Sequence, residues 1–100
     1  MKKYSYEEAL HRAAALCSMT EKSETDIHRK LLEWGLENSD CERILLRLKK
    51  ENFLNEERFA TAFVKDKFCF SQWGRLKITY ALRQKEISEQ FINEALSLID

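Results

Sequence analysis

The scarcity of turn-forming residues constrains the fold of this chain more than any other feature. Its 100 residues include no proline and only two glycines, Gly35 and Gly74. Average sequences carry roughly 7% glycine and 5% proline. Tight hairpins between strands depend on glycine and other residues that tolerate positive φ angles, whereas helix interiors do best without glycine or proline. The sequence therefore predicts an all-α fold.

Signals for helix starts recur along the chain. A serine followed three residues later by an acidic residue is typical of a capping box, in which the two side chains bind free amide groups of the first turn. Apolar residues then recur at helical spacing after each such signal. The predicted starts are Ser5 with Glu8, Ser23 with Asp26, Ser39 with Glu42, Asn55, about Gly74, and Ser88. The sequence thus predicts six helices, and Gly35 is placed to close the second one in the left-handed conformation.

The apolar residues of the two halves repeat. Up to Leu36, residues of the first half match those found 51 positions later, and beyond Leu36 the offset falls to 48. The matched pairs include Ala9 with Ala60, Ala13 with Val64, Cys17 with Phe68, Ile27 with Ile78, Leu31 with Leu82, Ile44 with Ile92 and Leu48 with Leu96. Such periodicity indicates repeated structural units. We expect two tandem three-helix repeats, residues 1–52 and 53–100, in a right-handed, bundle-like form.

Motifs for catalysis, metal binding and membrane insertion are missing from the sequence. His11 and His28 are isolated in the sequence. Cys17, Cys41 and Cys69 are too widely spaced for a zinc site, and three cysteines cannot all pair in a disulfide framework. No apolar run approaches the roughly 18 residues of a membrane span. We therefore predict a non-enzymatic cytoplasmic protein that has reduced thiols and no catalytic residue, cofactor or metal.

The positive charges of the chain are unevenly distributed. Seventeen basic residues balance seventeen acidic ones, yet residues 65–85 hold six cations against one acid, Asp66. Four of the six, Lys65, Lys67, Arg83 and Lys85, lie toward the C-terminal ends of predicted helices, where the helix dipole favours cations. Arg75 and Lys77 fall in a first turn, which the dipole disfavours, so an anionic partner is the better reason for them. Neighbouring Trp73 has two open interpretations, a core residue or an exposed contact anchor.

Five motifs, taken in order, resemble the RecX family. They are residues 23–27 (SETDI), 31–35 (LLEWG), 55–60 (NEERFA), 73–78 (WGRLKI) and 82–87 (LRQKEI). The resemblance covers nearly the whole chain, and its specificity lies in the order and spacing of the motifs. Glu86 departs from the family pattern because glycine is frequent at that position. The family also usually carries a third repeat, so we expect either a short member or part of a longer protein, in which two repeats alone would fold but inhibit weakly.

The resemblance implies a regulator that binds RecA filaments on DNA and restrains the recombinase, thereby regulating DNA repair and recombination. It also implies some direct affinity for DNA, for which the basic 65–85 segment is the candidate. The candidate RecA or DNA contacts are Lys65, Lys67, Trp73, Arg75, Lys77, Arg83 and Lys85. Two alternatives stay open: an autonomous DNA-binding module of the helix-turn-helix type, and a helical scaffold without regulatory function. The predicted fifth helix has no asparagine and few polar groups for reading bases.

The last predicted helix has more apolar surface than a terminal helix needs. Phe91 and Leu98 lie away from the stripe formed by Ile92, Leu96 and Ile99. Terminal repeats ordinarily present a polar outer face. The surplus predicts either a continuation of the repeat array or self-association through this helix.

Overall fold

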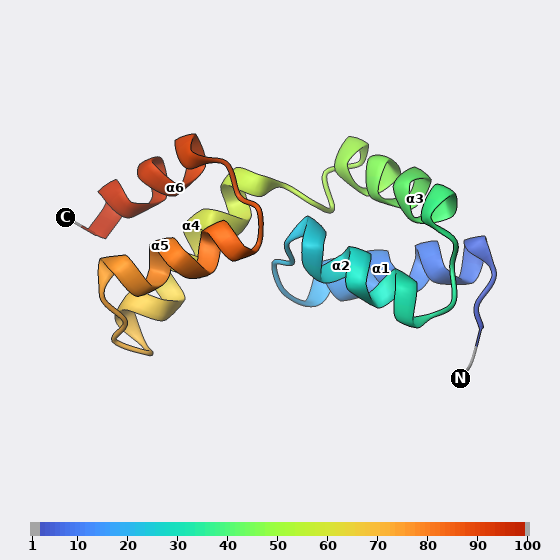
Figure 1. Ribbon diagram of the computed structural model, residues 1–100, viewed down its shortest axis with the longest axis horizontal. Helices are drawn as coiled ribbons and strands as arrows, with labels where there is room; N and C mark the ends of the chain where they lie inside the picture. Colours follow the sequence, from blue (N-terminus) through green and yellow to red (C-terminus); the bar gives the residue numbers. More distant parts are fainter. Residues whose placement is uncertain (1–2, 100) are drawn as a thin grey trace. The chain divides into compact units, whose positions relative to one another are not determined.

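The computed structural model describes residues 3–99, and these form six α-helices, one short 3-10 helix and no strand. The elements are α1 (Tyr6–Met19), α2 (Glu24–Glu33), α3 (Asn38–Lys50), α4 (Glu56–Cys69), α5 (Arg75–Gln84), α6 (Glu89–Leu96) and η1 (Ser97–Ile99) (Figure 1). The prediction of an all-α fold is confirmed. None of the helices in this part of the chain is long and apolar enough to cross a membrane.

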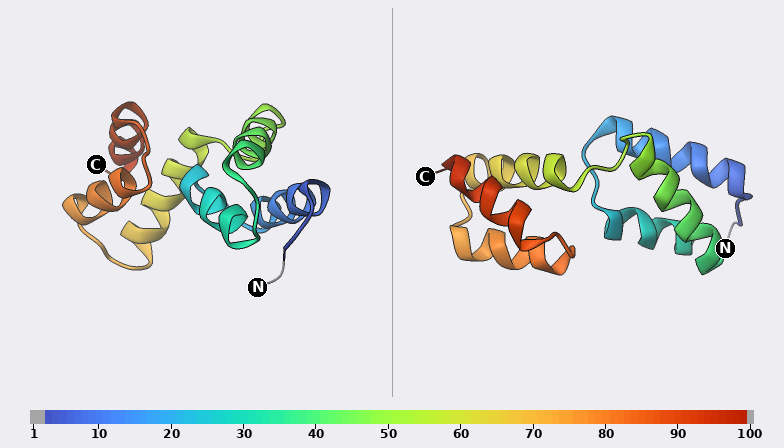
Figure 2. Two further views of the ribbon diagram at one scale, coloured as in Figure 1. Left: turned by 45° about the vertical axis from the view of Figure 1, so that its right-hand side comes forward. Right: turned by 90° about the horizontal axis from the view of Figure 1, so that it is seen from above.

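The chain folds as two compact units, Met1–Asn55 and Glu56–Asp100. Within each unit every helix packs against the other two, and Figure 2 shows the third helix of each unit lying between the first and second when viewed from above. The sequence placed the boundary after Asn52. The division falls after Asn55 because Phe53 and Leu54 pack against the apolar core of the first unit.

Equivalent residues form the cores of the two units. Ile27 and Leu31 on α2 are fully buried in the first core, and Ile78 and Leu82 on α5 are fully buried in the second. These four were predicted to be buried pairs at an offset of 51, and the prediction is confirmed. Burying a large aliphatic side chain stabilises a fold by about 1.5–3 kcal/mol, so these positions contribute much of each unit's stability.

The predicted change of offset beyond Leu36 is wrong. α3 begins at Asn38 with Glu37 as its N-cap, rather than at a capping box on Ser39, and α6 begins at Glu89 with Ser88 as its N-cap. The offset of 51 therefore continues, and it pairs buried Cys41 with Ile92, Ile44 with Ala95 and Leu45 with Leu96. It also pairs buried Leu48 with partly buried Ile99. An offset of 48 would pair buried Cys41 with exposed Glu89. Three residues are nearly one helical turn, so apolar periodicity alone did not distinguish the two offsets.

Two of the predicted capping boxes are confirmed. The Ser5 hydroxyl accepts a hydrogen bond from the Glu8 amide at 3.2 Å, while Glu8 accepts one from the Ser5 amide at 2.9 Å. Ser23 and Asp26 form the same reciprocal pair at 3.1 and 3.2 Å. Ser88 is the N-cap of α6 as predicted, but its side chain makes no cap hydrogen bond.

The turns after α2 and α5 are built alike. Gly35 has a φ of 88°, as predicted, and Glu86 occupies the equivalent position with a φ of 60°. In each turn the next residue donates its amide to a carbonyl five positions back, Leu36 to Leu31 at 3.2 Å and Ile87 to Leu82 at 3.1 Å. Both turns thus follow the Schellman pattern, whose left-handed position favours glycine. Glu86 adopts that conformation at a free-energy cost, about 1–2 kcal/mol for a residue with a Cβ.

Two expectations about apolar side chains need correction. The repeat pairs Phe68 with Cys17, which predicts a core position for both, but Phe68 is 41% exposed because Val64 is the last residue of α4 within the second core. α6 ends at Leu96, so Ile99 belongs to η1 rather than to that helix. Phe91 is partly buried against the second core and Leu98 is exposed, so the apolar surplus at this end is smaller than the sequence indicated.

Candidate partner-binding surface of the second unit

The first turn of α5 carries cations without a side-chain cap. Gly74 is the N-cap and makes no side-chain cap hydrogen bond, and the turn contains Arg75 and Lys77 but no acidic residue. The helix dipole leaves partial positive charge at an N-terminus, so local electrostatics disfavour this arrangement. The reason for these cations must therefore lie outside the turn itself.

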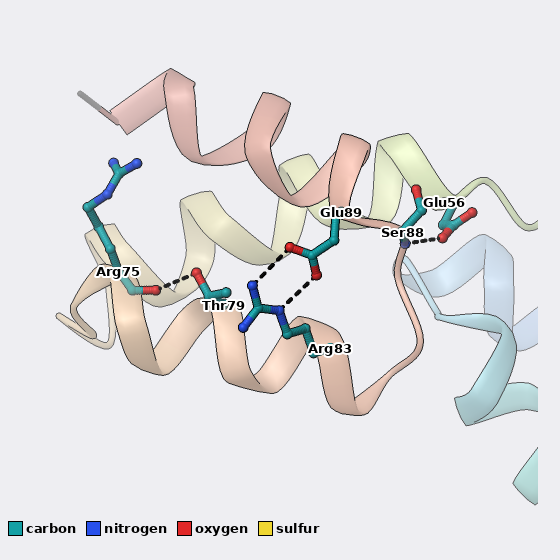
Figure 3. Close-up of polar contacts among 6 residues, drawn as sticks. All are labelled: Glu56, Arg75, Thr79, Arg83, Ser88 and Glu89. Carbon is teal, nitrogen blue, oxygen red and sulfur yellow. Dashed lines mark hydrogen bonds and ion pairs between the residues drawn. The ribbon is translucent and has the colours of Figure 1, made fainter.

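Arg75 has an intramolecular partner at the far end of α6. Its guanidinium donates a hydrogen bond from Nη1 to the carbonyl oxygen of Leu96 at 3.2 Å. Figure 3 shows the Arg75 side chain extending from the start of α5 toward α6. A cation at a helix C-terminus binds unpaired carbonyl groups and complements the negative end of the dipole. For Arg75 the dipole argument therefore no longer requires an outside anion.

Lys77 belongs to a cluster of cations and aromatic rings that joins α4 to the start of α5. Its Nζ lies 4.3 Å from the centroid of the Trp73 ring, and Lys67 Nζ lies 5.0 Å from the same centroid. Trp73 meets Phe63 edge to face, with centroids 6.2 Å apart, and is partly buried against the second core. Trp73 is thus a half-buried platform that holds two lysine ammonium groups by cation–π attraction. We call Lys67, Trp73 and Lys77 the lysine–tryptophan cluster.

The remaining candidates lie outside this cluster. Arg83 forms a two-point ion pair with Glu89 on α6, with nitrogen–oxygen distances of 2.7 and 2.9 Å (Figure 3). Hydrogen bonding to Glu89 raises the pKa of Arg83, and the same bond lowers the pKa of Glu89. Lys85 is the C-cap of α5, with its Nζ 5.9 Å from the Phe59 ring centroid. Lys65 is exposed on α4. The structure therefore brings three of the seven predicted residues together and separates the other four.

Two exposed apolar side chains on α5 were not among the predicted contact residues. Leu76 is 88% exposed and Tyr80 is 66% exposed. They are four residues apart, so they lie on the same side of the helix. Residues at this spacing fall opposite Ile78 and Leu82, and this phase was the signal in the sequence that could have revealed them.

Two of the three cysteines are core residues. Cys17 and Cys41 are buried, whereas Cys69 is exposed. Burial raises the pKa of the Cys41 thiol, which favours the unreactive protonated form. Within residues 3–99, no three side chains of histidine, cysteine, aspartate or glutamate gather as metal ligands would.

Comparison with known proteins shows which family this helical chain is similar to. Residues 55–96 match the family model described as the second three-helix domain of RecX. The regulatory protein RecX of Clostridium perfringens is 40% identical over 81 residues, which are 81% of this chain and 37% of that protein. RecX of Prosthecochloris aestuarii is 33% identical over 92 residues, covering 92% of this chain and 61% of that protein. The chain belongs to the RecX family.

A crystal structure of a regulatory protein RecX supports the same assignment. It matches 95% of this RecX-family chain and 48% of its own chain, with a TM-score of 0.86 and 27% sequence identity. The chain spans between 37% and 61% of the two relatives described above. The family and its tandem three-helix architecture are thus shown, and the chain is similar to proteins that are named as regulators.

Proposed function

We propose that this RecX-family chain binds RecA filaments on DNA and restrains their recombinase activity, thereby regulating DNA repair. The observation that carries the proposal is the RecX similarity, which extends through both units: the alignment with the Prosthecochloris aestuarii relative covers 92% of the chain. The proposed activity is one of binding, because the prominent features of the second unit are exposed cations and apolar side chains rather than a group of catalytic residues.

The charges of the second unit support an anionic or acidic partner. α5 contains Arg75, Lys77 and Arg83 and no acidic residue. Lys77 and Lys67 are held over the ring of Trp73, which orders two flexible side chains before any partner arrives. Ordering side chains in advance reduces the entropy lost on binding. We assign the first contact with the filament to the lysine–tryptophan cluster.

A titration of RecA ATPase activity on single-stranded DNA tests the proposal. Adding the chain should inhibit ATP hydrolysis below one chain per RecA, because an end-binding or groove-binding regulator acts on many subunits at once. Replacing Lys67 and Lys77 by glutamate should weaken this inhibition, most clearly in low salt, where screening is weakest. Lys50→Glu, which alters an exposed cation in the last turn of α3, is the matched control and should inhibit like the wild type.

Two results of this titration would contradict the proposal. Absence of any effect on RecA would leave a helical scaffold as the better description. Selective binding to duplex DNA without an effect on RecA would favour an autonomous DNA-binding module instead.

A further inference from the structure

The outward side of α5 carries both exposed apolar side chains and a positively charged one. Leu76, Tyr80 and Arg83 are spaced by four and three residues and therefore form one stripe along the helix. The stripe faces away from Ile78 and Leu82, which are fully buried. Leu76 and Tyr80 are among the most exposed large apolar side chains of the described residues, at 88% and 66%. We call Leu76, Tyr80 and Arg83 the α5 stripe.

The equivalent helix of the first unit shows that the fold does not require this stripe. Thr25 and Arg29 on α2 stand at the positions of Leu76 and Tyr80. Both helices bury the same pair of core positions and end in the same type of turn. Because α2 forms with Thr25 and Arg29 at these two positions and carries an exposed leucine, Leu32, only at the position of Arg83, the exposed leucine and tyrosine of α5 do not serve the packing of the repeat.

The charges around the stripe define what it would bind. Arg83 lies on the stripe itself, and its ion pair with Glu89 is more than half exposed on both sides. Lys77 flanks the stripe one residue from Leu76, and α5 carries no acidic side chain that would repel a negative partner. An apolar centre with a cationic margin is complementary to an apolar patch bordered by acidic groups.

A protein surface fits the stripe better than a DNA backbone. A phosphodiester chain offers nothing that would favour an aliphatic side chain such as Leu76, whereas protein interfaces bury leucine and tyrosine in their centres. Tyrosine and arginine are also enriched among the residues that dominate binding energy. We propose that the α5 stripe is a docking surface for an acidic protein patch with an apolar centre, which, if the function proposed above holds, lies on RecA.

Co-sedimentation of the full chain with RecA filaments assembled on single-stranded DNA tests this assignment. The test variant carries Leu76→Ser and Tyr80→Ser. The matched control is Leu46→Ser, which removes a 66% exposed leucine from α3 of the first unit. Neither change touches a core, so circular dichroism and the thermal midpoint should remain as in the wild type. We expect the double substitution to weaken filament binding by about tenfold or more, as for loss of interface hot spots, and the control to bind normally.

The other outcomes separate this proposal from the proposed function. Wild-type binding that survives the double substitution would overturn the docking assignment and leave the proposed function standing. If the double substitution weakens binding to free single-stranded DNA as much as binding to filaments, the stripe binds DNA and the docking assignment is overturned. Self-association of the wild type can be measured by analytical ultracentrifugation. If the double substitution abolishes it, the stripe binds a second copy of the chain and the docking assignment is overturned. A wild type that fails to sediment with filaments would overturn both proposals.

Discussion

The starts of α2 and α5 are equivalent positions in the two units, yet they are built from opposite chemistry. At the start of α2, Ser23 and Asp26 cap each other's amides, and Glu24 forms an ion pair with Lys49 on α3 at 3.1 Å. Acidic side chains in the first turn and a cation at the end of α3 both complement the helix dipoles. The capping pair and the acidic Glu24 at the start of α2 thus have their partners within the same unit.

At the start of α5, every one of these positions differs. Gly74 stands in place of the capping serine, Arg75 in place of Glu24 and Lys77 in place of the capping aspartate. Arg75 recovers part of the loss through its bond to the Leu96 carbonyl, and Lys77 lies over Trp73. The same fold therefore tolerates an uncapped helix start whose cations contact a carbonyl group and an aromatic ring of the same unit.

The largest expected effect tests whether the two cores are equivalent. Leu31→Ala and Leu82→Ala should each lower the free energy of unfolding of their own unit by about 2–5 kcal/mol, because each removes a fully buried side chain. Chemical denaturation followed by circular dichroism measures both. A loss below about 0.5 kcal/mol at either position, the range of surface substitutions, would show that the two cores are not equivalent.

The turns after α2 and α5 give the next effect, with opposite signs. Gly35→Ala should destabilise the first unit by more than about 1 kcal/mol, because alanine is strained at a positive φ. Its Cβ would also come within 2.6 Å of the Lys3 Cγ, so that side chain must move. Glu86→Gly should stabilise the second unit by about 1 kcal/mol by relieving the left-handed glutamate. If Glu86→Gly lowers the thermal midpoint, the glutamate side chain has a stabilising contact that outweighs the strain.

Helix caps should show a smaller difference. Ser23→Ala should destabilise α2 by about 1–2 kcal/mol, since it removes a largely buried hydroxyl that accepts the Asp26 amide. Ser88→Ala is the matched control at a helix start where the serine side chain makes no cap bond, and it should stay within about 0.5 kcal/mol. Equal losses from the two substitutions would contradict the distinction between them.

The smallest effect concerns the exposed ion pair between α5 and α6. Hydrogen bonding to Arg83 lowers the pKa of Glu89, so the pair stabilises the fold at neutral pH and its contribution disappears as the pH falls through that lowered pKa. Arg83→Gln should raise the pKa of Glu89 toward its ordinary value in an NMR titration, whereas Arg43→Gln in the first unit should leave it unchanged. Since both partners are more than half exposed, stability should change little. A Glu89 pKa that is the same with Arg83→Gln would refute the ion pair.

The sequence predicted much of the fold because helical periodicity and helix caps are local signals. The buried pairs on α2 and α5, the two capping boxes and the left-handed Gly35 all follow from residues close to one another in the chain. The start of α3 was misplaced because Ser39 resembles a capping serine, although Glu37 occupies the cap. The exposure of Phe68 depends on where the core ends along α4, which is a property of tertiary packing.

The candidate surface could be predicted only in part. The clustering of cations between residues 65 and 85 is visible in the sequence, as is the unusual placement of Arg75 and Lys77. Their partners were not predictable, because the bond from Arg75 to Leu96 spans 21 residues and the position of Lys77 over Trp73 depends on the connection before α5. Leu76 and Tyr80 were predictable as exposed residues, because their helical phase is opposite to that of Ile78 and Leu82.

We propose that Lys77, in the first turn of α5, serves a partner rather than the stability of the helix. The most direct test transfers the capping pair of α2 to α5, by Gly74→Ser together with Lys77→Asp. A Cβ at Gly74 meets no other atom within 4 Å, so the serine can be accommodated. The new cap should contribute about 1 kcal/mol, offset in part by the lost cation–π contact. Binding to RecA filaments is then measured beside the thermal midpoint. We expect an unchanged or higher midpoint with weaker filament binding. A variant that is equally stable and binds as tightly as the wild type would contradict the proposed role of Lys77.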